Sequence, residues 1–104
     1  MSDPVLDHLL GDHEGIVKRL IEYARIPSVS TDPGYADGMA AARKLLIDRL
    51  EDAGFSNVKQ LEAGGHPAIF GEWLGLAGAP TYLVYGHYDV QPPDPLDKWH
   101  SAPF

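Results

Sequence analysis

The sequence predicts an α/β fold in which two helical segments precede three strands and a closing loop. Residues 4–25 and 35–53 carry apolar side chains at helical spacing. After Phe55 that periodicity gives way to short β-branched and aromatic runs separated by glycine-rich turns. A length of 104 residues suffices for one small domain, so we expect a single domain over residues 1–104.

The first helical segment is expected over residues 4–25. Gly11 can interrupt it, in which case Asp12 caps a second helix. Pro27 ends the helical pattern, and a loop is expected after it.

The next helix, over residues 35–53, has the most regular periodicity in the chain. Asp32 followed by Pro33 matches an N-cap with proline in the first turn. One continuous apolar stripe runs along the helix: Met39, Ala42, Leu46, Leu50 and Ala53. Gly54 stands where a left-handed residue commonly ends a helix.

Three strands are expected after this helix, at residues 57–63, 68–74 and 81–86. The third, "TYLVYG", is apolar on both faces, which is typical of an interior strand covered on both sides. The prolines that follow Gln91 predict an irregular surface loop.

The charge and the lack of cysteine argue against several kinds of partner and site. The net charge is -7, from 15 acidic and 8 basic residues, and the basic residues are scattered. Nucleic-acid binders usually carry a basic patch, and an acidic chain is repelled by anionic membranes, so neither partner is expected. The absence of cysteine excludes thiolate metal sites and cysteine nucleophiles. With no signal-peptide pattern, a cytoplasmic location is the expectation.

His87 and Asp89 follow the third predicted strand directly, in the stretch "YLVYGHYDVQP". Residues two apart in extended chain point to the same side, so both side chains should enter one crevice. Three uses fit the pair. The first is a metal site, in which His87 binds the ion and Asp89 is either a further ligand or the group that supports His87. The others are an acid–base pair and a histidine satisfied by the backbone at a strand end. The spacing alone leaves all three open.

The wider sequence resembles a family of zinc-dependent metallopeptidases that includes dipeptidases, aminoacylases and deacylases. The resemblance lies in G-H-x-D-V-x-P at Gly86–Pro92 and W-x-x-x-P-F at Trp99–Phe104, and extends to "IPSVS" at 26–30 and "LEDAGF" at 50–55. It is closest to the carnosine-dipeptidase-like branch. It implies that the chain is the incomplete N-terminal part of a three-layer α/β/α catalytic domain.

The resemblance also implies a chemistry. His87 matches a metal ligand, and Asp89 matches the catalytic aspartate that supports this histidine and the metal centre. The cofactor would be two zinc ions, with manganese or cobalt as alternatives. Metal-activated water would hydrolyse a short peptide or an N-acyl amino acid, and the full-length parent could be a homodimer.

The family's other metal ligands and its Glu-Glu pair have no match in this sequence. We therefore expect a fragment that is inactive alone and binds metal at most weakly. The alternatives are a non-catalytic α/β interaction module or pseudoenzyme that retains the family's first half, and a chain completed by a separate partner chain.

The remaining candidate residues have structural expectations. Turn or helix-entry roles are expected for Ser28 and Ser30, and loop-packing roles for Trp99 and Phe104. The other histidines and loop carboxylates are expected to be solvated surface groups: His8, His13, His66, Asp94 and Asp97. His100 is assigned no role.

Overall fold

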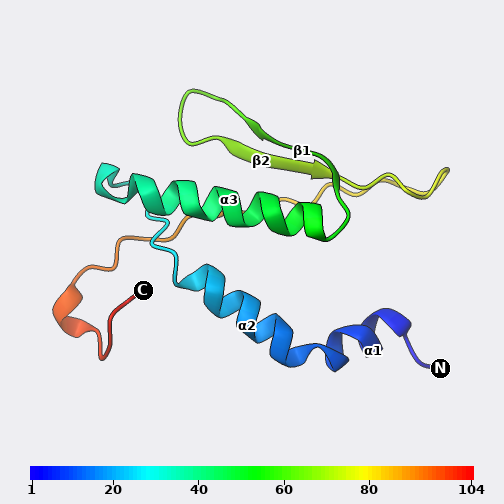
Figure 1. Cartoon of the computed structure of the whole chain (residues 1–104), viewed down its shortest axis with the longest axis horizontal. Helices are drawn as coiled ribbons and strands as arrows, with labels where there is room; N and C mark the ends of the chain where they lie inside the picture. Colours follow the sequence, from blue (N-terminus) through cyan, green and yellow to red (C-terminus); the bar gives the residue numbers. More distant parts are fainter.

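A β-hairpin packed on a long helix forms the centre of the computed structural model, which describes all residues 1–104. In Figure 1 the hairpin follows one side of α3, while α2 and α1 lead away from it toward the N-terminus. The elements are α1 (Pro4–Gly11), α2 (His13–Ala24), the 3₁₀ turn η1 (Pro33–Tyr35), α3 (Ala36–Asp52), β1 (Ser56–Leu61), β2 (Ala68–Glu72) and the 3₁₀ turn η2 (Leu96–Lys98). The α/β class is confirmed.

The first helical segment divides at Asp12, as its sequence allows. The Asp3 carboxylate caps α1 by accepting from the backbone N–H groups of Val5 and Leu6, at 2.9 and 3.2 Å. Asp12 stands at the start of α2, but its side chain makes no capping bond. The Asp12 carboxylate instead accepts from the Arg19 guanidinium at 2.7 Å, and this bond lowers its pKa.

Both ends of the α3 region match their sequence signals. The Asp32 side chain accepts from Gly34 N–H at 2.8 Å and starts η1, which leads directly into α3. At the other end, Gly54 adopts φ +89°. Its N–H donates to the Glu51 carbonyl at 2.9 Å, and Phe55 N–H donates to that of Leu50 at 3.0 Å. These two bonds are those of a Schellman motif.

The hairpin pairs β1 and β2 in antiparallel register, with Lys59 opposite Phe70 and Leu61 opposite Ala68. An irregularity between Ser56 and Lys59 interrupts the ladder. The fully buried core is small and lies between α3 and the loop that precedes it. Six of 104 residues are buried: Ser28, Val29, Gly38, Met39, Ala42 and Pro93.

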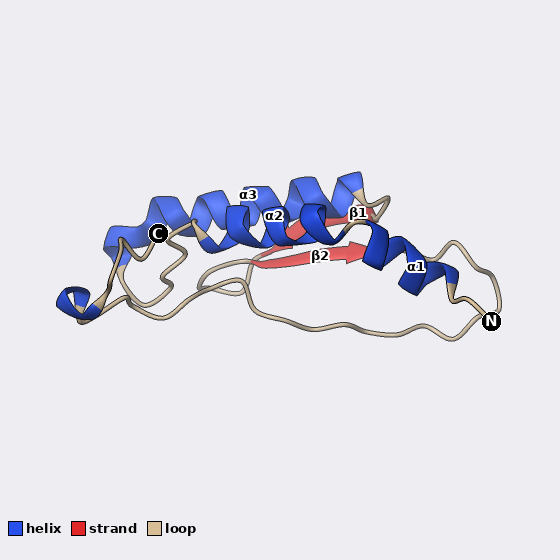
Figure 2. Cartoon of the chain, turned by 90° about the horizontal axis from the view of Figure 1, so that it is seen from below, coloured by secondary structure: helices blue, strands red, loops and turns tan.

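The third predicted strand is not formed, and this part of the expected order is wrong. Residues 81–86 belong to no sheet, and the only sheet has two strands. Figure 2 shows this stretch passing the hairpin as a long loop. Its apolar side chains are almost fully solvated: Leu83 is 92% exposed and Val84 90%. A strand requires a hydrogen-bonded neighbour as well as suitable side chains, and no backbone bond joins residues 81–86 to any element.

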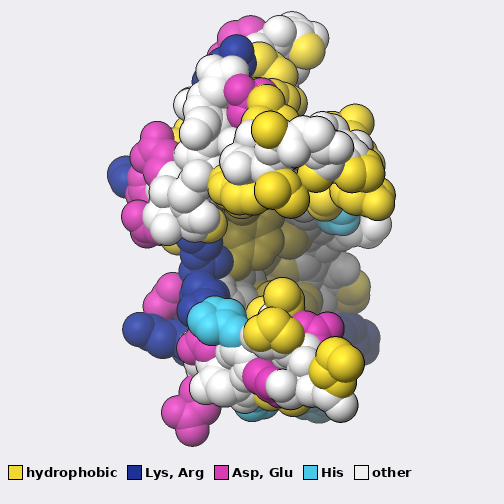
Figure 3. Space-filling view, turned by 90° about the vertical axis from the view of Figure 1, so that its right-hand side faces the viewer, with side chains coloured by type: hydrophobic (Ala, Val, Ile, Leu, Met, Phe, Trp, Pro, Cys, Tyr) yellow, Lys and Arg dark blue, Asp and Glu magenta, His cyan; other side chains and the backbone are white.

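Exposed apolar side chains are also found on the N-terminal helices. They include Leu6, Leu9, Leu10, Leu20 and Ile21, together with Trp73 and Leu74 after β2. Figure 3 shows apolar side chains facing solvent over both the upper and the lower part of the molecule. None of the helices has the length and apolar character needed to cross a membrane.

The unpaired segment Tyr82–Tyr85 leads to a prediction about association. Uncharged, β-prone stretches with free backbone groups pair readily with other chains. We expect Val84→Lys to reduce self-association of the chain, measured by sedimentation velocity over a concentration series. A lysine lowers the net negative charge and so by itself favours association, which makes a decrease informative. Val17→Lys, the same change on α2, is the matched control; an equal decrease there would refute a role for the segment.

Candidate metal centre

Three segments distant in sequence meet around His87 and Asp89. Val90 forms a parallel bridge with Val29, and Val90 N–H donates to the Ser28 carbonyl at 2.9 Å. This contact joins the loop after α2 to the chain that follows the unpaired segment. The join therefore places the "IPSVS" loop beside the "GHYD" stretch.

Two tyrosines secure the same junction. The Tyr23 hydroxyl, from α2, donates to the Tyr88 carbonyl at 2.7 Å. The Tyr88 hydroxyl donates in turn to the Pro67 carbonyl, just before β2, at 2.6 Å. Burial raises the pKa of Tyr23, and the nearby negative charge of Asp89 raises it further. Tyr23 therefore remains a protonated donor at neutral pH.

His87 and Asp89 lie on the same side of the chain, as the i, i+2 spacing predicts. Nδ1 of His87 is 2.9 Å from the Asp89 carboxylate oxygen Oδ1 and 3.1 Å from the Asp89 carbonyl. Both oxygens can only accept, so Nδ1 must carry the proton and donate. In the neutral imidazole, Nε2 then holds the free lone pair that a metal ion requires.

The second oxygen of the Asp89 carboxylate is also bonded. The Ser30 hydroxyl donates to Oδ2 at 2.6 Å, across 59 residues of sequence. The bond from Ser30, followed by the bond from His87, lowers the pKa of Asp89. Asp89 is therefore a carboxylate at neutral pH and acts as an acceptor toward both neighbours.

The donor set suits a divalent metal but does not complete a site. The His87 side chain is 78% exposed and Asp89 40%, so an ion could approach the ring freely. No group of three or more His, Cys, Asp or Glu side chains is close enough together to hold a metal. A catalytic zinc ion usually takes three protein ligands, which is more than His87 and Asp89 together can provide.

Sequence reasoning missed the partners of this pair. Ser30 lies in a turn, as expected, but its hydroxyl also bonds to Asp89. His66 is an exposed surface group, as expected, but its Nε2 lies 3.0 Å from the Ser30 carbonyl. Since a carbonyl only accepts, His66 Nε2 is the donor. The serine-containing motif at 26–30 was the available signal, but the long-range pairing of Val29 with Val90 was not readable from it.

The loop after Gln91 behaves as expected. Trp99 Nε1 donates to the Pro93 carbonyl at 2.7 Å, and Phe104 packs edge-on against Tyr35 with ring centroids 6.4 Å apart. Asp94, Asp97 and His100 are exposed. None of these side chains bonds to His87 or Asp89.

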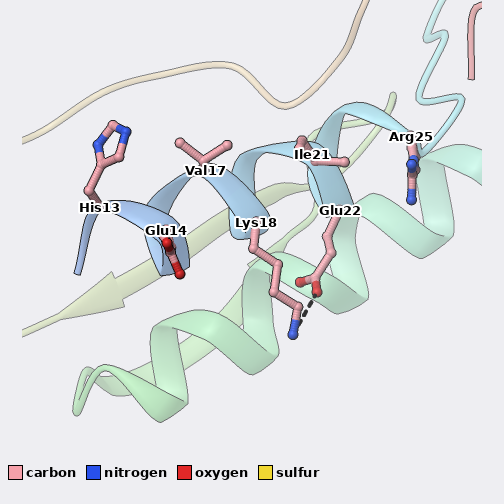
Figure 4. Close-up of a pocket in the computed structure, with 7 residues that line it drawn as sticks. All are labelled: His13, Glu14, Val17, Lys18, Ile21, Glu22 and Arg25. Atoms are coloured by element: carbon pink, nitrogen blue, oxygen red, sulfur yellow. Dashed lines mark ion pairs between the residues drawn. The ribbon is translucent and has the colours of Figure 1, made fainter.

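A shallow depression elsewhere is distinct from this centre. Its seven lining residues come from α2 and its C-cap, between His13 and Arg25 (Figure 4). Lys18 and Glu22 form an ion pair at its edge, at 3.7 Å. It contains neither His87 nor Asp89.

Comparison with known proteins gives relatives of one kind. Cys-Gly metallodipeptidases from Candida albicans and Saccharomyces cerevisiae are 30% and 31% identical over 97% and 83% of this chain, which correspond to 23% and 20% of their own lengths. Succinyl-diaminopimelate desuccinylase from Bordetella pertussis is 41% identical over 86% of this chain and 20% of its own length.

The chain thus spans about a fifth of the length of the curated relatives it matches. No protein-family model and no solved structure matches it. Since the matches to the dipeptidases and desuccinylases extend over most of its residues, the chain belongs to the metallopeptidase family that contains them.

Proposed function

We propose that this chain contributes one histidine ligand and its orienting carboxylate to the divalent-metal centre of an amide hydrolase. The observation that carries the proposal is the Nδ1–H donation from His87 to Asp89 at 2.9 Å. A carboxylate–histidine pair of this kind fixes the ring and raises the basicity of the nitrogen that binds the metal. His87 is the metal ligand, and Asp89 is the residue that supports it.

The metal best suited to the pair is zinc, since imidazole and carboxylate are common zinc ligands. Manganese and cobalt are the alternatives. When bound, such an ion activates water and polarises the carbonyl of the scissile amide. The chain's own contribution is to present Nε2 of His87 unprotonated and in a fixed direction.

The substrate class follows from the relatives' names and remains part of the proposal. Cys-Gly metallodipeptidase is named for cleavage of a dipeptide, and succinyl-diaminopimelate desuccinylase for removal of a succinyl group from an amino acid, so both names describe cleavage of an amide bond. Short peptides or N-acyl amino acids are therefore the proposed substrates. The 104-residue chain, which holds one ligand and its support, is proposed to be inactive by itself.

The exposure of Tyr82 and Tyr85, 84% and 91%, favours this proposal over a free-standing interaction module. A free-standing module that folds as a stable monomer would bury the apolar side chains of the stretch Tyr82–Tyr85. A chain that functions with further polypeptide around it has no such requirement.

Expression of the whole gene, including any coding sequence beyond Phe104, tests the proposal. With zinc supplied, we expect hydrolysis of Cys-Gly, of other dipeptides or of N-succinyl amino acids, measured by release of free amine. His87→Ala should reduce the rate by at least about a thousandfold, because the metal loses a protein ligand. The purified 104-residue chain should show none. Activity that persists in His87→Ala or after metal chelation would refute the proposal.

A further inference from the structure

We propose that Ser30 is a positioning residue for the metal ligand: its hydroxyl fixes the Asp89 carboxylate, which in turn holds His87 in the tautomer with a free Nε2. The inference rests on the proposed metal-binding role of His87. It assigns a function to the loop after α2, which lies 57 residues before the histidine in sequence.

The first step is the geometry of the carboxylate. Each Asp89 oxygen has one partner: Oδ2 accepts from Ser30 at 2.6 Å, and Oδ1 accepts from His87 at 2.9 Å. Hydrogen bonds to an ionised acceptor are short and strong, and two of them on different oxygens define the plane of the group. Rotation of the carboxylate would break both bonds.

The second step is that Ser30 is itself held in place. Val29 is fully buried and pairs with Val90, one residue from Asp89. The Ser30 carbonyl lies 3.0 Å from Nε2 of His66. The backbone on each side of the hydroxyl is therefore fixed, so the donor points at Oδ2 without a large entropic cost.

The third step concerns the histidine. Its side chain is 78% exposed, so packing does not determine the orientation of the ring. Both recorded bonds of its Nδ1 go to Asp89. A carboxylate freed from Ser30 can turn toward water, since Asp89 is 40% exposed. The proton would then distribute between the two ring nitrogens.

The test compares two variants of nearly identical shape, Ser30→Val and Ser30→Thr, in the 104-residue chain without metal. Two-dimensional ¹H–¹⁵N NMR at about pH 8.5, where histidines are ordinarily neutral, reports which nitrogen of His87 carries the proton. We expect the Nδ1–H tautomer in the wild type and in Ser30→Thr. We expect a mixture weighted toward Nε2–H in Ser30→Val. Ser101→Ala, at an exposed serine, is the control.

A wild-type His87 with no preference for Nδ1–H would overturn the inference, and so would a Ser30→Val variant that keeps it. If Ser30→Val also loses the Val29–Val90 contact, seen as changed amide shifts, Ser30→Ala decides, since it removes the hydroxyl without adding bulk. Retention of the tautomer in Ser30→Ala refutes the inference.

Zinc titration followed by the same His87 resonances separates this inference from the proposed function. We expect about tenfold weaker zinc binding in Ser30→Val, the lower end of the range for groups that orient a ligand, with recovery in Ser30→Thr. A wild-type chain with the Nδ1–H tautomer and no response to zinc at His87 would refute the proposed function and leave the positioning role standing. Equal zinc affinity in all variants, with a shifted tautomer, would refute the effect on the metal.

Discussion

Replacing His87 with alanine should abolish zinc binding by the 104-residue chain. The wild-type chain should bind zinc weakly, with a dissociation constant in the micromolar range or above, because one imidazole and one nearby carboxylate fall short of the three protein ligands a catalytic zinc ion usually takes. Isothermal titration calorimetry under conditions that keep the chain monomeric measures both. No other histidine in the chain bonds to a carboxylate as His87 does, so we expect no second zinc site in the His87→Ala variant.

Two variants make this result specific. Asp89→Asn retains the size of the side chain but removes the charge that holds the Nδ1 proton, and should weaken binding by about 10- to 100-fold. His100→Ala removes an exposed histidine that has no bond to the centre, and should leave binding unchanged. Sub-micromolar affinity in the wild-type monomer, or equal affinity in wild type and His87→Ala, would contradict the assignment of His87 as the ligand.

Features that depend on neighbouring residues could be read from the sequence. The Asp32–Pro33 start and the Gly54 end of α3 are set by bonds that span two to five residues, and both are present as expected. The pairing of His87 with Asp89 is equally local, because i and i+2 share a side in extended chain. The break between the first two helices lies at Asp12, as predicted. The Asp12 carboxylate was expected to cap the second helix, but it accepts a bond from Arg19 instead.

Features that depend on a distant partner could not be read in this way. "TYLVYG" has the composition of a strand, but its backbone finds no neighbour among the 104 residues, so residues 81–86 remain unpaired. Ser30 also depends on a distant partner, but here the partner is present. The bridge between Val29 and Val90, which are 61 residues apart in sequence, brings this loop serine next to Asp89. Strand propensity is a property of the residues themselves, whereas strand pairing requires a neighbouring segment with free backbone groups.

The packing of α3 against the loop after α2 determines whether Ser30 reaches Asp89. Gly38, in the first turns of α3, is buried, and a Cβ atom there would overlap the carbonyl oxygen of Pro27 and lie 2.7 Å from the Pro27 carbonyl carbon. These are backbone atoms, so no side-chain rotation can make room. The loop that carries Ser30 therefore lies directly on α3 at the only position of the helix without a side chain.

Gly38→Ala should consequently destabilise the chain, although alanine is the better helix former. The helical preference favours alanine by about 1 kcal/mol. Overpacking against fixed backbone costs about 1–3 kcal/mol, and an overlap this close belongs at the upper end. We expect a net loss of about 1–2 kcal/mol in the free energy of unfolding, measured by urea denaturation followed by circular dichroism.

Gly11→Ala is the matched control, because Gly11 also lies in a helix and has open space where its Cβ would be. That variant should be unchanged or more stable by up to about 1 kcal/mol. Gly38→Ala should in addition weaken zinc binding, since a displaced Pro27 moves the loop that holds Ser30, whereas Gly11→Ala should not affect it. If Gly38→Ala is as stable as Gly11→Ala and binds zinc as the wild type does, the loop does not depend on close contact with α3, and the link from this helix to the metal ligand is wrong.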